Sequence, residues 1–296
     1  MSLRKVIVMS LSVLLLACFV QAGPKFSLKL YGGPGFWTTG GDFKGLFEST
    51  LDRLRSVGYT GTFDLDWKPL SFEGGIQAVA MLTPQFGLAI GVGFLSKSIN
   101  QDASYADEVA SVQLTTSRLI RSVPVSLNLL YLVPAGPARI TLSAGASYYS
   151  SRFKLEEQVY YLEPGYYQKP NYKRDVLETF DSDPKGAIGF QAGISVEVKL
   201  FGPASLCVDA LYRIVSFDDI QGTYGWDEHD SWTGGGATDT FTIEQAKMWY
   251  DTCSLWGGTY NFIDYYKTQP SNADKARLFK ISMDGPVFLI GLKIGL

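Results

Sequence analysis

Six charged residues stand in segments that are otherwise small or apolar: Lys29, Glu197, Lys199, Asp209, Arg213 and Lys293. Both signs are present, so these side chains could pair with one another or line a polar path for a solute. Neighbouring segments suggest pairs such as Glu197 with Arg213, although the sequence alone does not fix a strand register. We expect a structural ion-pair network, because paired charges satisfy one another inside a narrow interior.

His229, the single histidine, is the other residue with catalytic potential. His229 and Ser231 have the residue types of a base and a nucleophile. They precede Gly234, Gly235 and Gly236 in what we expect to be a long loop, whereas catalysis needs rigidly held groups. The nearby acidic residues lack the spacing of a calcium loop, and no cysteines have zinc-ligand spacing. We therefore expect no enzyme activity, no catalytic residue, no metal and no cofactor.

Eight segments of the sequence have apolar residues at every second position, which predicts β-strands. The six charged residues lie in these segments. The pattern is clearest between Phe86 and Ser96, where Phe, Leu, Ile and Val alternate with Gly and Ala. The predicted strands are Lys25–Tyr31, Glu73–Leu82, Phe86–Ser96, Leu119–Val133, Ala138–Ser151, Gly186–Leu200, Ser205–Val215 and Pro286–Leu296.

The connections between these strands alternate in length. Short turns join the second strand to the third, the fourth to the fifth and the sixth to the seventh. The other connections are long and cover about residues 32–72, 97–117, 152–185 and 216–282. With both termini at one end, all short turns fall at that end and all long loops at the other, as in outer-membrane barrels.

The direction in which the apolar face points decides the class of the protein. A lipocalin-type soluble barrel also has eight alternating strands, but its apolar face lines a cavity. Here the opposite face carries the six charges among Gly, Ala and Ser. Each Lys or Arg turned into lipid would cost roughly 2–4 kcal/mol. We therefore predict that the apolar face points outward.

The last strand ends the chain with Gly291, Ile294 and Leu296 in a Gly-x-x-apolar-x-apolar pattern. This pattern, together with the strand and turn arrangement, resembles the small eight-stranded outer-membrane barrels of the OmpX, OmpW and OmpA-transmembrane types. The resemblance implies an all-β, eight-stranded antiparallel up-and-down transmembrane barrel with long extracellular loops, in the outer membrane of a Gram-negative-type bacterium. No motif singles out one member of this class.

Residues 1–22 have the features of a signal peptide: Arg4 and Lys5, an apolar run, and a small-residue site for cleavage after Ala22. Residues 23–296 would then form the barrel domain. Cys18 lies in a segment similar to a lipoprotein acylation box, which is an alternative at the same place. A disulfide between Cys207 and Cys253 depends on geometry that the sequence does not provide.

The long connections hold aromatic residues and two stripes of apolar residues at helical spacing, one after Asp42 and one from Thr242 to Trp249, which predict short helices in these loops. The aromatic residues could contact an extracellular protein or glycan, or pack on one another. With a net charge of −3 and no basic patch, nucleic acid is not an expected partner. We expect a monomer in outer-membrane lipid that serves surface binding or envelope structure. The alternatives are a narrow pore or carrier for small apolar molecules, and a lipid A-modifying enzyme.

Overall fold

The computed structural model describes residues 25–38, 40–42, 60–64, 69–106, 110–136, 138–163, 170–255, 258–270 and 276–296. Within these ranges, the side chains of residues 60, 63–64, 251–255 and 258–262 are not described. The predicted signal peptide with its cleavage site after Ala22, Cys18, and the stripe after Asp42 lie outside the described residues. Within the described ranges, no helix combines the length and the apolar composition needed to cross a membrane.

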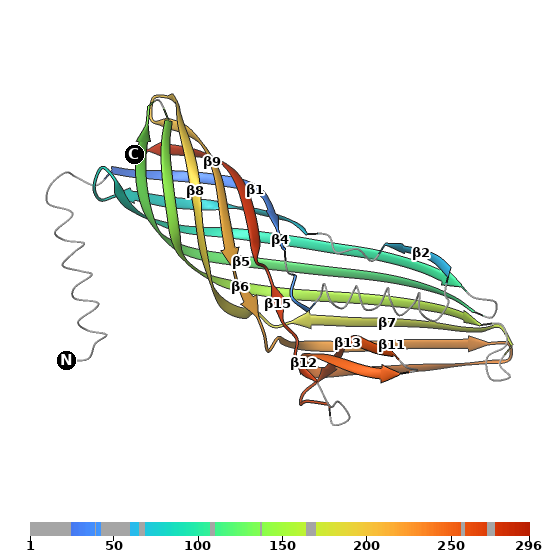
Figure 1. The fold of residues 1–296 in the computed structure, drawn as a ribbon. Coiled ribbons are helices and arrows are strands. Elements are labelled where there is room, and N and C mark those ends of the chain that lie inside the picture. The colour runs from blue at the N-terminus through green and yellow to red at the C-terminus, as the bar shows by residue number, and fades with distance from the viewer. Residues whose placement is uncertain are drawn as a thin grey trace, which may run out of the picture.

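The described residues form sixteen strands, and all pairings between them are antiparallel (Figure 1). The prediction of an all-β, up-and-down antiparallel chain is confirmed. The strands are β1 (Lys25–Phe36), β2 (Thr60–Asp64), β3 (Leu70–Met81), β4 (Phe86–Ala106), β5 (Ser111–Ala135), β6 (Ala138–Glu163), β7 (Tyr172–Ser182), β8 (Lys185–Phe201), β9 (Ala204–Ile214), β10 (Ser216–Phe217), β11 (Gln221–Trp232), β12 (Gly235–Leu255), β13 (Gly258–Tyr266), β14 (Arg277–Leu278), β15 (Ile281–Ser282) and β16 (Gly285–Gly295).

Eight of these strands pair in a closed cycle. The order is β1, β3, β4, β5, β6, β8, β9 and β16, and β16 pairs again with β1. A cyclic antiparallel sheet has no free edge, so these strands form a barrel, which we call the ring. They coincide with the eight segments in which the sequence shows apolar alternation.

The short turns of the ring all lie at one end, together with the carboxyl terminus (Figure 1). They cover residues 82–85, 136–137 and 202–203 between consecutive strands. At this end the backbone N–H of Leu296 donates to the carbonyl of Phe26 at 2.9 Å, which fixes the last residue against the first strand.

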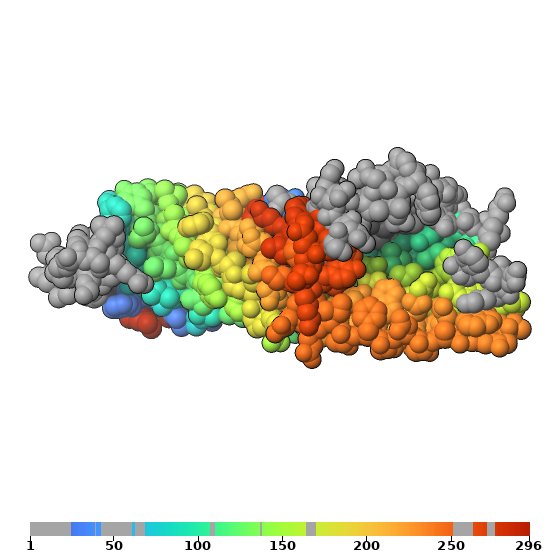
Figure 2. Space-filling view, turned by 90° about the horizontal axis from the view of Figure 1, so that it is seen from below, coloured from blue at the N-terminus to red at the C-terminus, as the bar shows by residue number. Residues whose placement is uncertain are grey.

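Beyond the ring, three of its strands continue into a second body of sheet that we call the extension. It contains residues 95–106 of β4, 111–122 of β5 and 152–163 of β6, together with β2, β7, β11, β12, β13 and β14. The sheet divides on β6, which pairs with β8 up to Ser151 and with β7 from Lys154 onward. Figures 1 and 2 show the extension as a long body projecting from one end of the ring.

The outward-facing residues of the ring strands are apolar, and they end where the extension begins. Along β4, Phe86, Ile90 and Phe94 are exposed, whereas Ser98 and Asn100 occupy the same face further on. Every ring strand contributes exposed Phe, Leu, Ile, Val or Tyr residues, and Leu129 reaches 67% exposure. We call this surface the apolar belt. The exposed fraction of Ile290 is 64% and that of Leu289 is 6%, so the predicted orientation of the last strand is the one in the structure.

An apolar cluster fills the junction between the ring and the extension. Its fully buried members come from both bodies of sheet and from the short β10–β15 pair. They include Trp37, Leu95, Phe153, Phe217, Phe279, Ile281 and Met283. Close packing of such large side chains leaves little room for water between them, so side chains occupy the space where the ring meets the extension.

Two predictions about the long connections are wrong. The segments expected to be loops supply eight further strands, so the part of the chain that the structure describes has sixteen strands instead of eight. The predicted helix from Thr242 to Trp249 is part of β12. Its helix-like spacing fails because these residues pair with β11 on one side, and because Gln245 has a left-handed backbone with φ of 56° that bends the strand.

Candidate functional site

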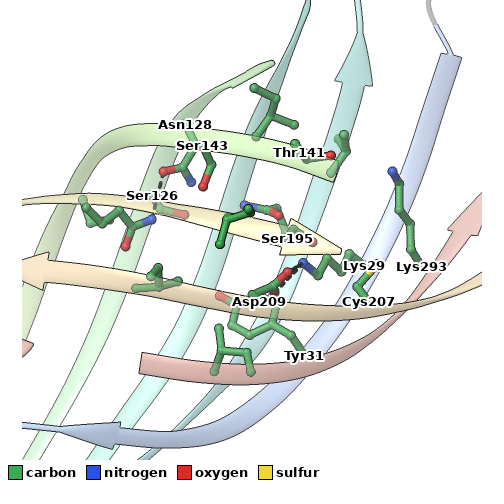
Figure 3. A pocket seen from close by; sticks show the side chains of 18 of the residues that line it. Lys29, Tyr31, Ser126, Asn128, Thr141, Ser143, Ser195, Cys207, Asp209 and Lys293 are labelled. Atoms are coloured by element: carbon green, nitrogen blue, oxygen red, sulfur yellow. Dashed lines mark hydrogen bonds and ion pairs between the residues drawn. The ribbon is translucent and has the colours of Figure 1, made fainter. Parts of the chain in front are cut away.

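The interior of the ring contains three ion pairs, and each one crosses over at least one intervening strand. Successive side chains of a strand point to opposite faces, and the residues next to these charges in the sequence belong to the apolar belt outside. The charged side chains therefore point into the ring. Lys29 on β1 bonds Asp209 on β9 with N–O distances of 2.5 and 2.7 Å (Figure 3). Both side chains are about nine-tenths buried.

The Lys29–Asp209 pair passes over β16, and Gly291 is the residue that lies beneath it. A Cβ atom at Gly291 would lie 2.7 Å from the carbonyl oxygen of Leu30 and 3.0 Å from Cε of Lys29. Distances this short require the backbone or the lysine to move. A glycine is therefore needed at this position to let a long side chain cross the strand.

A second pair lies nearer the short turns. Lys293 on β16 donates to Glu197 on β8 at 2.7 Å, and it passes over β9 where Cys207 is buried. Arg139 approaches the other oxygen of Glu197 at 3.9 Å but is mostly exposed. Glu197 is thus held by one partly buried and one exposed cation.

The third pair lies nearest the apolar cluster and joins Arg213 on β9 to Glu73 on β3. Two N–O distances of 2.7 and 2.8 Å link one guanidinium nitrogen to both carboxylate oxygens. Arg213 is 2% exposed, and its Nε donates to the carbonyl of Met283 at 3.0 Å. A Cβ at Gly35 would collide with Oε1 of Glu73, so a second glycine makes room for this pair.

The structure therefore brings together five of the six predicted site residues, in pairs that the sequence did not identify. Glu197 is bound to Lys293 and not to Arg213. Lys199 is exposed and makes no ion pair within the described part of the chain. Sequence reasoning missed Glu73, although it stands at the start of an alternating strand on the same face as Gly75 and Gln77, which is the signal that could have found it.

Around these pairs lies a cavity of about 110 Å³, large enough for a few water molecules. Polar and apolar residues both line it, and Ser126, Thr141, Ser143 and Ser195 are among the polar ones (Figure 3). Asn128 accepts a hydrogen bond from the Gln191 amide at 2.9 Å across the same space. The arrangement can hold charge and water in fixed places, and the apolar cluster lies above it.

His229 and Ser231 lie on β11 and not in a loop, so the expectation of a long loop at this place is wrong. The His229 side chain is mostly exposed and approaches Asp227 at 3.2 Å and Thr238 at 3.4 Å. It makes no hydrogen bond with Ser231 among the described contacts. In the described residues no group of three or more His, Cys, Asp or Glu side chains could hold a metal ion.

Cys207 is buried and has a free thiol, whereas the side chain of Cys253 is outside the described set. The aromatic residues expected in loops divide between the two faces of the extension. Tyr172 is buried, and Tyr224 and Tyr265 stack with their ring centroids 4.5 Å apart. Tyr266 is exposed. Part of the aromatic set thus forms the core of the extension.

No protein-family model matches the chain, and no curated protein matches it either. Among solved structures, the chain is similar to a major outer membrane protein from Thermus thermophilus. The sequence identity is 17%, the TM-score is 0.38, and the similarity covers 93% of this chain and 100% of the other. A similarity at this level does not support a function, so the function of this chain has to rest on its own residues.

Proposed function

We propose that this chain is a non-enzymatic outer-membrane β-barrel that anchors the extension at the cell surface. The apolar belt is the observation that supports this role. Contiguous exposed apolar area of this kind is rare on soluble monomers. It surrounds a barrel whose charges are inside, which is the arrangement of membrane barrels and the opposite of a lipocalin.

The height of the belt agrees with the thickness of a membrane. On β5 the exposed apolar residues run from Val123 to Val133. At about 3.4 Å per residue this stretch measures roughly 34 Å along the strand. With a strand tilt near 45° it spans about 24 Å along the membrane normal, close to the ~25 Å apolar band of outer-membrane barrels.

The interior of the ring supports a structural role for the barrel. Three ion pairs join strands across the inside, and the apolar cluster occupies the space where the ring meets the extension. An open pore or a carrier path would need a route past these groups. We therefore infer that the barrel is an anchor, and that the extension makes the contacts with an extracellular protein or glycan.

A lipid-modifying activity has less support. Enzymes that act on membrane lipids need their catalytic groups at the level of the membrane surface. His229 lies seven residues along β11 from Gly222, and β11 runs away from the ring (Figure 1). At about 3.4 Å per residue this places His229 roughly 24 Å further out than the start of the strand.

Spin labels at two matched sites test the membrane placement. In a chain whose native cysteines are replaced by alanine, Ile290→Cys labels the belt and Ser98→Cys labels the outer face of the extension. In lipid vesicles we expect the Ile290 label to be reached by dissolved oxygen and not by a water-soluble nickel chelate. The Ser98 label should show the reverse.

The proposal also predicts heat-modifiable gel mobility of the protein from purified outer membranes, because a closed barrel resists detergent until it is heated. A label at Ile290 that the nickel chelate reaches freely would disprove the membrane placement. A soluble monomer obtained without detergent would do the same.

A further inference from the structure

The bend in β12 folds part of the extension back over itself. Residues 235 to 247 of β12 pair with β11, whereas residues 247 to 255 pair with β13, so the change of partner comes two residues after Gln245. The φ of 56° at Gln245 and a register shift between Gly222 and Tyr224 on the partner strand mark the bend. As a result Tyr265 of β13 lies against Tyr224 of β11 with nearly parallel rings, 12° apart.

A cleft of about 380 Å³ lies beside this bend. Tyr265 also stacks on Phe180 of β7, so the three strands are held together at one side of the cleft. Trp226 and Phe241 also line the cleft and lie nearly parallel at a centroid distance of 6.0 Å, and Phe241 is 6.1 Å from the Tyr224 ring. The residues around the cleft are Glu178, Tyr224, Trp226, Glu228, Asp239, Phe241, Ile243, Ile263, Asp264, Tyr265 and Tyr266. Five of these are aromatic.

The charge of the cleft is negative. Four of its lining residues are carboxylic acids, and none is Lys, Arg or His. One of the four, Glu228, is paired with Arg174 outside the cleft at 2.6 Å. Glu178 accepts a hydrogen bond from the Tyr224 hydroxyl at 3.2 Å. Burial raises the pKa of Glu178 to about 7, so this carboxyl is only partly ionised near neutral pH. The lining still includes Asp239 and Asp264 and no cationic side chain, so its charge is negative.

We propose that this cleft binds a small organic cation of the alkylammonium class. The faces of Trp and Tyr rings carry negative charge density and attract ammonium groups, and carboxylates at the rim add to that attraction. A divalent metal ion fits less well, because the described residues hold no group of three His, Cys, Asp or Glu side chains that could bind it. A neutral sugar could use carboxylates as hydrogen-bond acceptors, but it would not offset their charge.

The cleft belongs entirely to the extension, so a ligand could occupy it whether or not the ring spans a membrane. This separates the two tests. If choline does not bind, the case for membrane anchoring is unaffected. If the membrane test fails, the case for the cleft is unaffected.

Choline and its neutral carbon isostere 3,3-dimethyl-1-butanol are the probes that decide the matter. Both are titrated against the purified full chain, with calorimetry and the tryptophan fluorescence as readouts. We expect saturable binding of choline and at least about tenfold weaker binding of the isostere. Equal binding of the two, or no saturable binding of choline up to about 10 mM, would overturn the proposal.

Variants locate the site. Asp239→Asn and Phe241→Leu should each weaken choline binding about fivefold or more. Phe241 is 43% exposed, so its replacement leaves the packed core in place. The matched control is Asp227→Asn, next to Trp226 on the same strand, whose carboxylate bonds Thr240 and is not part of the cleft. If Asp227→Asn weakens choline binding as much as Asp239→Asn and Phe241→Leu do, the proposal is also overturned.

Discussion

The ion pair between Glu73 and Arg213 gives the sharpest test of how the interior is stabilised. Replacing Glu73 with Gln keeps the size of the side chain and removes its charge. The Arg213 guanidinium, 2% exposed, would lose its counter-charge and one of the two carboxylate oxygens that it contacts at 2.7 and 2.8 Å, and would keep the bond from Nε to Met283. Leaving a buried charge uncompensated costs about 3–5 kcal/mol. We expect the free energy of unfolding to fall by that amount.

The double variant Glu73→Met with Arg213→Met separates charge from packing. Replacing both partners of a buried pair with apolar residues of similar size is often nearly neutral. We therefore expect the double variant to regain most of the stability that Glu73→Gln loses. The control is Glu156→Gln, whose side chain is exposed on the outer face of β6 in the extension. It should change the free energy of unfolding by less than about 0.5 kcal/mol.

Urea unfolding in lipid vesicles, followed by tryptophan fluorescence and by heat-modifiable mobility, measures these differences. The pair is buried, so the loss in Glu73→Gln should change little with salt concentration. A Glu73→Gln variant within about 1 kcal/mol of the parent would show that water or another group compensates Arg213. Direct pairing of buried charges would then not be what stabilises the interior.

Three further outcomes follow from the described contacts. Gly291→Ala should lower the free energy of unfolding by about 1–3 kcal/mol, because its Cβ would collide with the Leu30 carbonyl and with Lys29. The control Gly32→Ala, whose Cβ would have its nearest neighbour at 3.5 Å, should change the free energy of unfolding by less than about 1 kcal/mol. Urea unfolding compares the two variants. The purified barrel in planar bilayers should show no discrete openings, and regular conductance steps would refute the anchor role. Burial, together with the charge of Glu157, raises the pKa of Glu178 in the extension to about 7. The folded state therefore binds this proton more tightly than the unfolded state, so the stability it gives is present below pH 4.5 and is lost as the pH rises through about 7. Proteolysis of the extension should be slower at pH 5 than at pH 8, measured with a protease active at both values, and Glu178→Gln should reduce the difference.

The ring could be predicted from the sequence because its environment has two clear sides. An apolar outer surface on one side and a narrow interior on the other impose alternation, and Phe86 to Phe94 show it without interruption. The charges inside could be predicted for the same reason. Their partners could not, since Glu73 and Arg213 are 140 residues apart and only the register of the closed ring brings them together.

The extension escaped prediction because its strands lack that contrast. In β7, Lys173, Asp175 and Glu178 are spread over both faces, so no apolar period appears. The acidic and glycine-containing residues of β11 resemble a loop for the same reason. At Gln245 the strand bends, and the apolar residues around the bend have a spacing that resembles that of a helix. Such segments form strands because they pair with strands that are distant in the sequence, and this pairing cannot be read from a single sequence.

The chain order of the extension has a consequence for how such a protein can change. β7 lies between two ring strands, and β11 to β15 lie between two others, so each part of the extension is an insert in a hairpin of the ring. The extension cannot be excised as one continuous piece and expressed alone. Each hairpin of the extension can, however, be shortened or lengthened separately, because the pairings that close the barrel are made among the eight ring strands alone. The surface of the extension can therefore change in sequence and length while the barrel stays the same.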